Sequence, residues 1–160
     1  MFKRKYQISK IVISTGIGKN RNLANFDDKV LPEIQNQLAL ITGQKPAVRR
    51  AKKAIAGFKT RVNDVIGLQV TLRGERMMAF LKKIGSIVLP RVKDFRGLDI
   101  ENVDSNGNLN IGLKEQFTFP EINMENSRVN FGLQITFVPF FRDREKAIEF
   151  YRELGLPLKK

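Results

Sequence analysis

Residues 65–73 spell VIGLQVTLR, and from Leu68 onward apolar and polar side chains alternate. Alternation with a period of two is typical of a strand that has one face on a core and the other in water. The core-facing set would be Leu68, Val70 and Leu72, and the opposite set would be Gln69, Thr71 and Arg73. This stretch therefore predicts a sheet with an apolar side and a polar side.

Three other segments are predicted to join the same sheet. Residues 7–14 are β-branched and would place Ile11 and Ile13 on one face, with Lys10, Val12 and Ser14 on the other. Residues 130–139 divide in the same way, with Phe131, Leu133, Ile135 and Phe137 on one face and Gln134 and Thr136 on the other. Asn106-Gly107 is the preferred pair for a type I′ hairpin turn and would lead into a strand over Leu109–Leu113.

Helical periodicity appears in three places. The first helical pattern runs from about Asn25 to Thr42, and Gly43 is expected to end the helix. Pro32 lies inside this pattern, which indicates either a kink or a helix proper that begins near the proline. A second helix is expected from Gly74 to Leu89, ended by Pro90. A third would span Arg142–Leu154, with Gly155 as its cap and four side chains inside: Ala147, Ile148, Tyr151 and Leu154.

Strands and helices mix without a βαβ repeat, which predicts an α+β fold. We expect an antiparallel β-sheet with α-helices packed on one face and a polar, basic face open to RNA. The 160 residues fit one domain, residues 1–160, with a protruding basic loop around residues 50–64. The open face would carry Lys10, Ser14, Gln69, Thr71 and Arg73.

The loop belongs to a strongly cationic stretch, KPAVRRAKKAIAGFKTR at residues 45–61. It holds seven cations and no acid: Lys45, Arg49, Arg50, Lys52, Lys53, Lys59 and Arg61. Its tip, residues 56–59, combines a flexible glycine, an aromatic ring and a cation, which suits phosphates and a base or sugar. A run of solvated charges is the plainer interpretation.

The distribution of charge favours the first interpretation. The formal net charge is +13. Residues 1–61 hold fourteen Lys and Arg against three acids, a net of +11, whereas residues 62–160 hold fifteen against thirteen, a net of +2. Such asymmetry indicates an anionic partner, nucleic acid first and an acidic membrane surface second.

Several classes of protein are disfavoured. Without histidine or cysteine the chain lacks the commonest general base, the common nucleophile pairs and the usual transition-metal ligands. Thr15–Asn22 has two glycines but matches neither a dinucleotide fingerprint nor a Walker A loop, and Leu109 replaces the glycine that an EF-hand starting at Asp104 would need. We expect no enzyme activity, no catalytic residues, no cofactor and no metal.

No apolar run approaches the roughly 20 residues that span a bilayer. The basic segment Met1–Tyr6 is not followed by the apolar region and cleavage site of a secretory signal. We expect a cytoplasmic protein without a membrane partner.

Longer segments of the sequence resemble those of the bacterial ribosomal protein L5 family, the large-subunit protein that binds 5S rRNA. The resemblance covers nearly the whole chain in order, which makes it very specific. The segments that carry it are ITGQKP at 41–46, RAKKAIAGFK at 50–59, VTLRGERM at 70–77, LPRVKDFRGL at 89–98, GLKEQ at 112–116 and FPEI at 119–122.

The resemblance implies a place in the central protuberance of the large subunit. It implies contacts with 5S rRNA, large-subunit rRNA, P-site tRNA, small-subunit head protein thirteen and other central-protuberance proteins. The tRNA-contacting part would be the loop around Ala56–Asn63, with Ala56, Gly57, Phe58, Lys59 and Arg61. The rRNA-binding residues would be Lys10, Ser14, Gln44, Lys45, Arg50, Lys52, Lys53, Gln69, Thr71 and Arg73.

The chain departs from the family pattern in two ways. Ser14 stands where the family usually has Asn, a longer side chain with more hydrogen-bonding groups. Only Met1–Tyr6 precedes the first strand, so the chain resembles a shortened member. Two other functions remain open from the residues alone: a free-standing RNA-binding regulator or chaperone on the same fold, and a two-carboxylate hydrolase, for which no carboxylate pair stands out.

Overall fold

The computed structural model describes residues 7–159, so the basic segment Met1–Tyr6 lies outside the described residues. Five strands form one sheet in the order β2-β3-β1-β5-β4, and every neighbouring pair is antiparallel. Their bounds are β1 Ile8–Gly16, β2 Ala47–Arg50, β3 Val65–Leu72, β4 Leu109–Leu113 and β5 Leu133–Pro139. The central strand β1 pairs with β3 on one side and β5 on the other.

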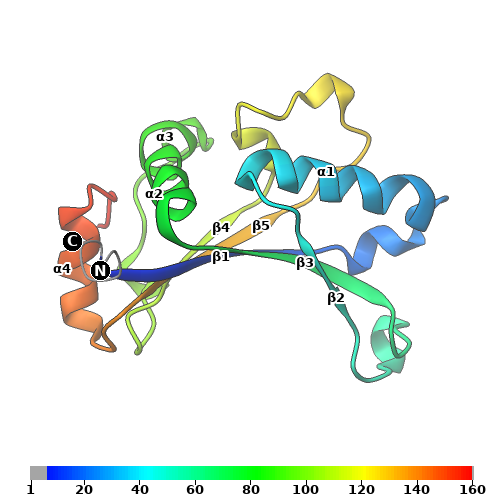
Figure 1. Cartoon of the computed structure of the whole chain (residues 1–160), viewed down its shortest axis with the longest axis horizontal. Coiled ribbons are helices and arrows are strands. Elements are labelled where there is room, and N and C mark those ends of the chain that lie inside the picture. Colours follow the sequence, from blue (N-terminus) through cyan, green and yellow to red (C-terminus); the bar gives the residue numbers. More distant parts are fainter. Residues whose placement is uncertain (1–6, 160) are drawn as a thin grey trace.

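Helices α1 (Leu31–Thr42), α2 (Gly74–Lys83) and α3 (Leu89–Arg91) lie over one face of this sheet (Figure 1). Helix α4 (Arg144–Glu153) lies at the end of the sheet where β1 begins and β5 ends (Figure 1). The α+β fold with an antiparallel sheet and helices on one face is therefore confirmed. Within residues 7–159 no helix is long and apolar enough to cross a bilayer.

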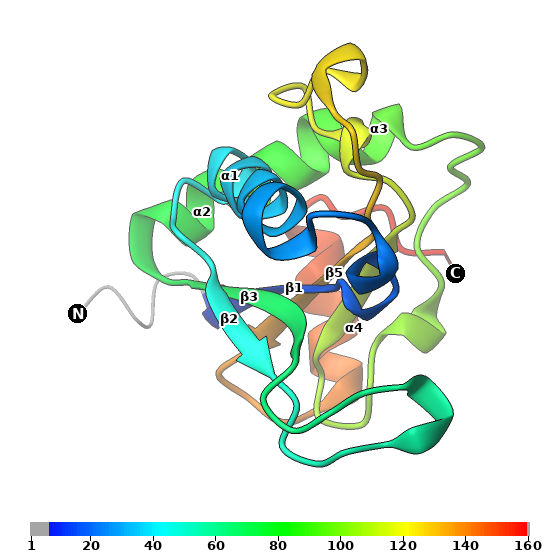
Figure 2. The same ribbon diagram turned by 90° about the vertical axis from the view of Figure 1, so that its right-hand side faces the viewer.

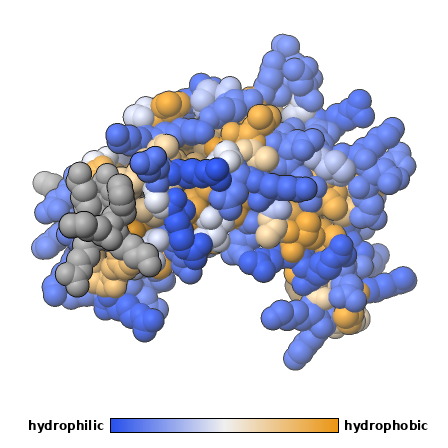
Figure 3. All heavy atoms as spheres, viewed as in Figure 1, coloured by the Kyte–Doolittle hydropathy of each residue, from blue (hydrophilic) through white to orange (hydrophobic). Residues whose placement is uncertain are grey.

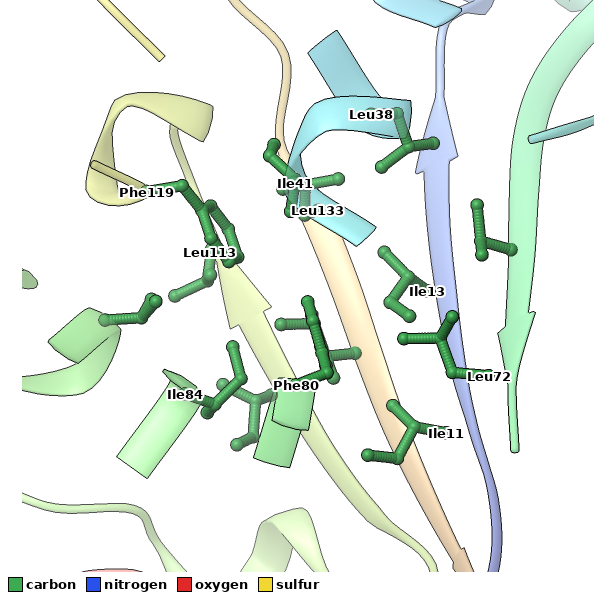
Figure 4. Packing of buried hydrophobic residues seen from close by; sticks show 14 of the residues in the cluster. Ile11, Ile13, Leu38, Ile41, Leu72, Phe80, Ile84, Leu113, Phe119 and Leu133 are labelled. Atoms are coloured by element: carbon green, nitrogen blue, oxygen red, sulfur yellow. The ribbon is translucent and has the colours of Figure 1, made fainter. Parts of the chain in front are cut away.

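The core fills the space between the sheet and the helices that cover it (Figure 4). Ile11, Ile13 and Leu72 point from the sheet toward Phe80 and Ile84, and all five side chains are buried. Because each buried aliphatic or aromatic side chain contributes roughly 1.5–3 kcal/mol, this layer holds the helices on that face and leaves the other face free.

Gln116 is a polar side chain within this apolar interior. Its Nε2 donates to the carbonyl oxygen of Val129 at 2.6 Å, and its Oε1 accepts from the backbone N–H of Phe131 at 3.0 Å. The side chain is fully buried. It thereby joins two parts of the irregular segment between β4 and β5, and the predicted strand at 130–139 begins only at Leu133.

The first helix begins near Pro32, as one of the two sequence interpretations held. Residues 26–30 form a wide π turn, Pro32 lies in the first turn of α1, and Gly43 ends the helix with a φ of +69°. The second helix differs from the prediction. A π turn over Ile84–Val88 joins α2 to α3, so Pro90 lies in the first turn of α3 and the helical backbone ends one residue after it. Pro90 has no N–H to donate to the preceding turn, and the helical backbone stops just after it.

The type I′ turn predicted at Asn106-Gly107 is wrong. Gly107 has a φ of +79°, but Asn106 does not share a positive φ, and the Gly107 N–H donates to the Asp104 oxygen at 3.0 Å. The loop has three residues and places its glycine in the left-handed position. Asp104 accepts backbone N–H bonds from Asn106 and Asn108, so its carboxylate supports the turn. Burial raises the pKa of Asp104, but these bonds and one from the Asn108 side chain outweigh it and leave that pKa below its usual value.

The C-terminal helix starts two residues later than expected, because Asp143 caps it by accepting from the N–H groups of Glu145 and Lys146. Gly155 ends it with a φ of +80°. Tyr151 is buried as predicted, and its hydroxyl lies 2.9 Å from the Gly107 carbonyl oxygen and 3.2 Å from that of Phe137. Two of the predicted inner residues, Ile148 and Leu154, are only partly buried, whereas Phe150 is buried.

Candidate nucleic-acid interface

The face of the sheet away from α1 and α2 consists of cross-strand rows of polar and small side chains. Ser14 lies between Gln69 of β3 and Gln134 of β5. In the next row Val12 lies between Thr71 and Thr136, and Thr136 donates to the amide oxygen of Asn110 at 2.7 Å. We call this surface the open face. Its outward positions are Lys10, Val12, Ser14, Gly16, Ala47, Arg49, Gly67, Gln69, Thr71, Asn110, Gly112, Gln134, Thr136 and Val138.

None of these outward positions is acidic, and two are cationic. A surface of amides, hydroxyls and cations offers both donors and acceptors to riboses and phosphates without repelling them. The face lies between α4 at one end and the loop at the other, and the lower outline of the molecule is indented between them (Figures 1 and 3).

Two contacts tie polar groups of the open face to its edge. Gln44 follows α1, and its Nε2 donates to the backbone oxygen of Thr71 at 3.4 Å. Arg49 lies on the edge strand β2, and its Nε donates to the Gln69 amide oxygen at 2.8 Å, with Nη2 donating to the same atom. These contacts leave both residues of each pair at the surface, where their remaining groups can meet a partner.

The basic loop, which we define as residues 51–64, connects β2 to β3 and projects beyond the sheet (Figure 2). Backbone bonds close its base: Ala51 donates to the Asp64 oxygen at 2.8 Å, and Asn63 donates to the Ala51 oxygen at 2.9 Å. Farther out, Ile55 and Thr60 form an antiparallel bridge. The loop is therefore a narrow, internally paired arm.

An ion pair fixes this base to the body. Arg21, in the turn after β1, lies 2.6 Å from the Asp64 carboxylate (Nη1 to Oδ2). The backbone N–H of Arg61 also donates to Asp64 at 2.5 Å. The hydrogen bond from Arg61 and the neighbouring Arg21 guanidinium hold the pKa of Asp64 below its ordinary value. The acid within the loop is thus neutralised at its base, which leaves the outer part cationic.

The tip of the loop is a single 3-10 turn over Ala56–Phe58. Phe58 is 80% exposed, and Lys59 has a φ of +50° and is exposed beside it. An aromatic ring this exposed has no role in the core, so it is available to stack on a base or to pack on a partner protein.

The structure brings most of the residues predicted to bind rRNA to one side of the molecule. Lys10, Ser14, Gln69 and Thr71 lie on the open face, and Gln44 contacts Thr71. Lys45, Arg50, Lys52 and Lys53 are exposed along the edge strand and the start of the basic loop. Arg73 differs, because it lies beyond β3 at the start of α2 rather than within a strand row.

Four polar or charged residues of the open face were not among the predicted binding residues. They are Arg49, Asn110, Gln134 and Thr136. Gln134 and Thr136 were already expected to face away from the core, so that alternation was the signal that could have found them. Asn110 and Arg49 needed the strand pairing itself, since nothing in their neighbourhoods marks the side on which they lie.

An open polar sheet face beside a cationic arm characterises the class of this protein: a structural protein suited to lie against a polyanion. Comparisons with known proteins identify the family. Residues 3–61 match the family model of ribosomal protein L5, and residues 65–158 match the model of the C-terminus of that family. The chain belongs to the ribosomal protein L5 family.

Curated relatives agree over nearly the full chain. The chain is 46% identical over 154 residues to the large ribosomal subunit protein uL5 of Thermus aquaticus, which covers 96% of this chain and 82% of that protein. It is 44% identical over 159 residues to uL5c of Gracilaria tenuistipitata var. liui, covering 98% and 87%. It is 45% identical over 154 residues to uL5 of Mycoplasma pneumoniae, covering 96% and 83%.

The protein is accordingly a structural constituent of the large ribosomal subunit and not an enzyme. The hydrolase alternative is thereby excluded. Ribosomes of the bacterial relatives lie in the cytoplasm, which agrees with the predicted location.

Proposed function

We propose that this protein binds 5S rRNA in the central protuberance of the large subunit through the open face and the base of the basic loop. The observation that carries the proposal is the absence of any acidic side chain among the outward positions of the five strands, beside an exposed row of cations. The rRNA-binding residues are Lys10, Ser14, Gln44, Lys45, Arg50, Lys52, Lys53, Gln69, Thr71 and Arg73, to which the pairing adds Arg49.

The two parts of this surface have different tasks. The open face is a pleated surface fixed by pairing between neighbouring strands, so its polar groups suit recognition of the shape of an RNA backbone. The lysines and arginines of the loop base supply the salt-sensitive part of the affinity. Gln44 and Thr71 lie at the junction of the two, which makes them the most informative positions for substitution.

The tip of the basic loop contacts a different RNA, the P-site tRNA, through Ala56, Gly57, Phe58, Lys59 and Arg61. The internal pairing of the loop supports this division, because it extends the outer part of the loop beyond the end of the sheet. Contacts with large-subunit rRNA, with small-subunit head protein thirteen and with other central-protuberance proteins complete the proposed assembly.

The test is a comparison of three single variants in 5S rRNA binding at matched salt. Thr71→Ala and Gln44→Ala should weaken binding by about 2- to 10-fold, as expected for the loss of one hydrogen bond each. Lys59→Ala should leave 5S affinity unchanged and impair tRNA handling on assembled ribosomes. Equal losses in all three variants would contradict the division between face and tip.

The binding itself has two controls. An unrelated RNA hairpin at the same salt measures the non-specific component, and equal affinity for the two RNAs would refute the proposal. A sucrose gradient of cell extract separates a ribosomal constituent, which sediments with the large subunit, from a free-standing regulator that stays near the top.

A further inference from the structure

A groove of about 990 Å³ lies between the basic loop and the turn at Gly18–Asn22. The turn contributes Gly18, Lys19, Asn20 and Asn22, and the loop contributes Ala51, Lys52, Lys53, Ile55, Phe58 and Thr60. The end of β1, the start of β3 and residues 130–132 form the rest of its lining. Pockets that hold small ligands measure roughly 300–1,000 Å³, so the groove has room for a nucleotide.

The charge of the groove favours an anionic ligand. Three lysines line it, Lys19, Lys52 and Lys53, and none of its lining residues is Asp or Glu. Asp64, the one acid of the basic loop, is not among the lining residues and is paired with Arg21. A phosphate entering the groove would therefore meet cations alone.

The walls of the groove are apolar, a property that the binding of a phosphate group alone would not need. Ile55 is 50% exposed and Ile66 is 38% exposed, and both side chains face this groove rather than the core. Apolar walls beside cations fit a ligand with a flat apolar part and an anionic part joined to it. A nucleotide whose base is not held in a helix has that composition, since stacked bases inside a duplex keep their faces covered.

The floor of the groove includes Gly16, and the protein itself has no need of a glycine there. A Cβ on Gly16 would meet nothing within 4 Å, and its φ is not in the left-handed region. Gly67 differs, because its Cβ would lie 2.8 Å from the Thr15 oxygen. The missing side chain at Gly16 thus leaves bare backbone for a partner, which suits the flat face of a base.

Asn20 adds a polar group. It lines the groove, and its buried Nδ2 finds no hydrogen-bond acceptor among residues 7–159. Buried amide donors are nearly always paired in folded proteins. A rotation of the Asn20 side chain would expose this donor to the groove, where the oxygen or ring nitrogen of a base edge would accept from it.

The groove is continuous with the open face, because Gly16 follows Ser14 on the outward side of β1 and Gly132 extends the row of Gln134. We infer that this groove receives an unpaired nucleotide of the same rRNA that lies on the open face, with its base on Gly16 between Ile55 and Ile66 and its phosphates at the lysines. This inference rests on the proposed 5S rRNA binding and names a subsite within it.

The test fills the groove and reads the bases of 5S rRNA. Gly16→Leu places a side chain in the groove at a position where its Cβ meets no protein atom within 4 Å, and Gly57→Leu is the matched control, since a Cβ at Gly57 in the loop tip also meets nothing within 4 Å. Each variant and the unsubstituted protein are bound to 5S rRNA, and dimethyl sulfate then reports which unpaired adenines and cytosines are shielded.

We expect the unsubstituted protein and Gly57→Leu to shield one or more unpaired bases. Gly16→Leu should leave those bases reactive at saturating protein and should weaken 5S binding about 5- to 150-fold, the equivalent of one lost base stack. Should circular dichroism show that Gly16→Leu unfolds the protein, Ile55→Glu, which puts an acid on an exposed wall, replaces it.

Two results would overturn the subsite. One is 5S binding by the unsubstituted protein with no unpaired base shielded, and the other is the same shielding and affinity in the groove variant. If Thr71→Ala weakens 5S binding while the groove variant does not, the result supports binding through the open face and refutes the subsite. If the unsubstituted protein shows no preference for 5S rRNA over an unrelated hairpin, the proposed function and the subsite both fall.

Discussion

Replacing Lys52 and Lys53 together by alanine tests the electrostatic part of RNA binding. Both side chains are exposed at the start of the basic loop, and neither forms an ion pair with any residue the structure describes. Among the described residues their removal therefore breaks no ion pair and no side-chain hydrogen bond. What should change is the number of phosphates that the protein neutralises.

The magnitude follows from counterion release. Each phosphate contact contributes about 0.7–0.9 to the slope of log affinity against log salt, so the double variant should lower the slope by about 1.4–1.8. The ratio of wild-type to variant affinity should consequently fall about tenfold between about 50 mM and 200 mM salt. The loss should be similar for 5S rRNA and for an unrelated RNA, because phosphate contacts carry no sequence information.

The assay is filter binding of labelled 5S rRNA over a salt series. Lys82→Ala is the control, because Lys82 is an exposed cation on α2, on the helix-covered side of the sheet (Figure 1). It should leave the slope unchanged. An unchanged slope in the double variant, or an equal change in the control, would refute the reasoning that the loop base lies on the phosphates.

Three other substitutions follow from individual contacts. Gln116→Leu leaves the Phe131 N–H unpaired in the core, while the Val129 carbonyl keeps its bond from the Ser127 hydroxyl, so the change should cost about 1–3 kcal/mol in urea unfolding. A change below about 0.5 kcal/mol would contradict the role of Gln116. Burial raises the pKa of Tyr151, whereas a tyrosine in the unfolded chain ionises near pH 10. The wild type should therefore lose stability as the pH rises above about 10, and the difference in unfolding free energy between wild type and Tyr151→Phe should narrow there. Ser14→Asn should tighten 5S rRNA binding by about 2- to 10-fold, since it supplies the amide that the family usually has, and an unchanged or weaker affinity measured by filter binding would argue against an RNA contact at this position.

The parts of the fold that the sequence predicted correctly are those with a strong repeating pattern. β3 and β5 alternate because one face is buried, and α1 and α2 carry apolar stripes because they cover that face. The edge strand β2 was not predicted. It has one neighbour and a single partly buried apolar side chain, Val48, so hydrogen bonding to β3 forms the strand without any alternation that a sequence pattern could show.

The candidate site could be predicted in composition but not in arrangement. The cations of the loop and the polar positions of β1 and β3 were expected from local sequence alone. Their alignment into rows depends on register between strands far apart in the chain, as when Ser14 meets Gln134. The groove at Gly16 depends on the same long-range geometry together with the path of the basic loop, and no local signal marks it.

The central position of β1 has a consequence for synthesis of the chain. Residues 8–16 are made first, yet β1 needs partners from residues 65–72 and 133–139. Half of the sheet can form once α2 has left the exit tunnel, while the other edge of β1 stays unpaired until almost the entire chain has been made. An unpaired strand edge invites intermolecular pairing, so the nascent chain passes through an aggregation-prone stage whose length is set by the translation of residues 73–139.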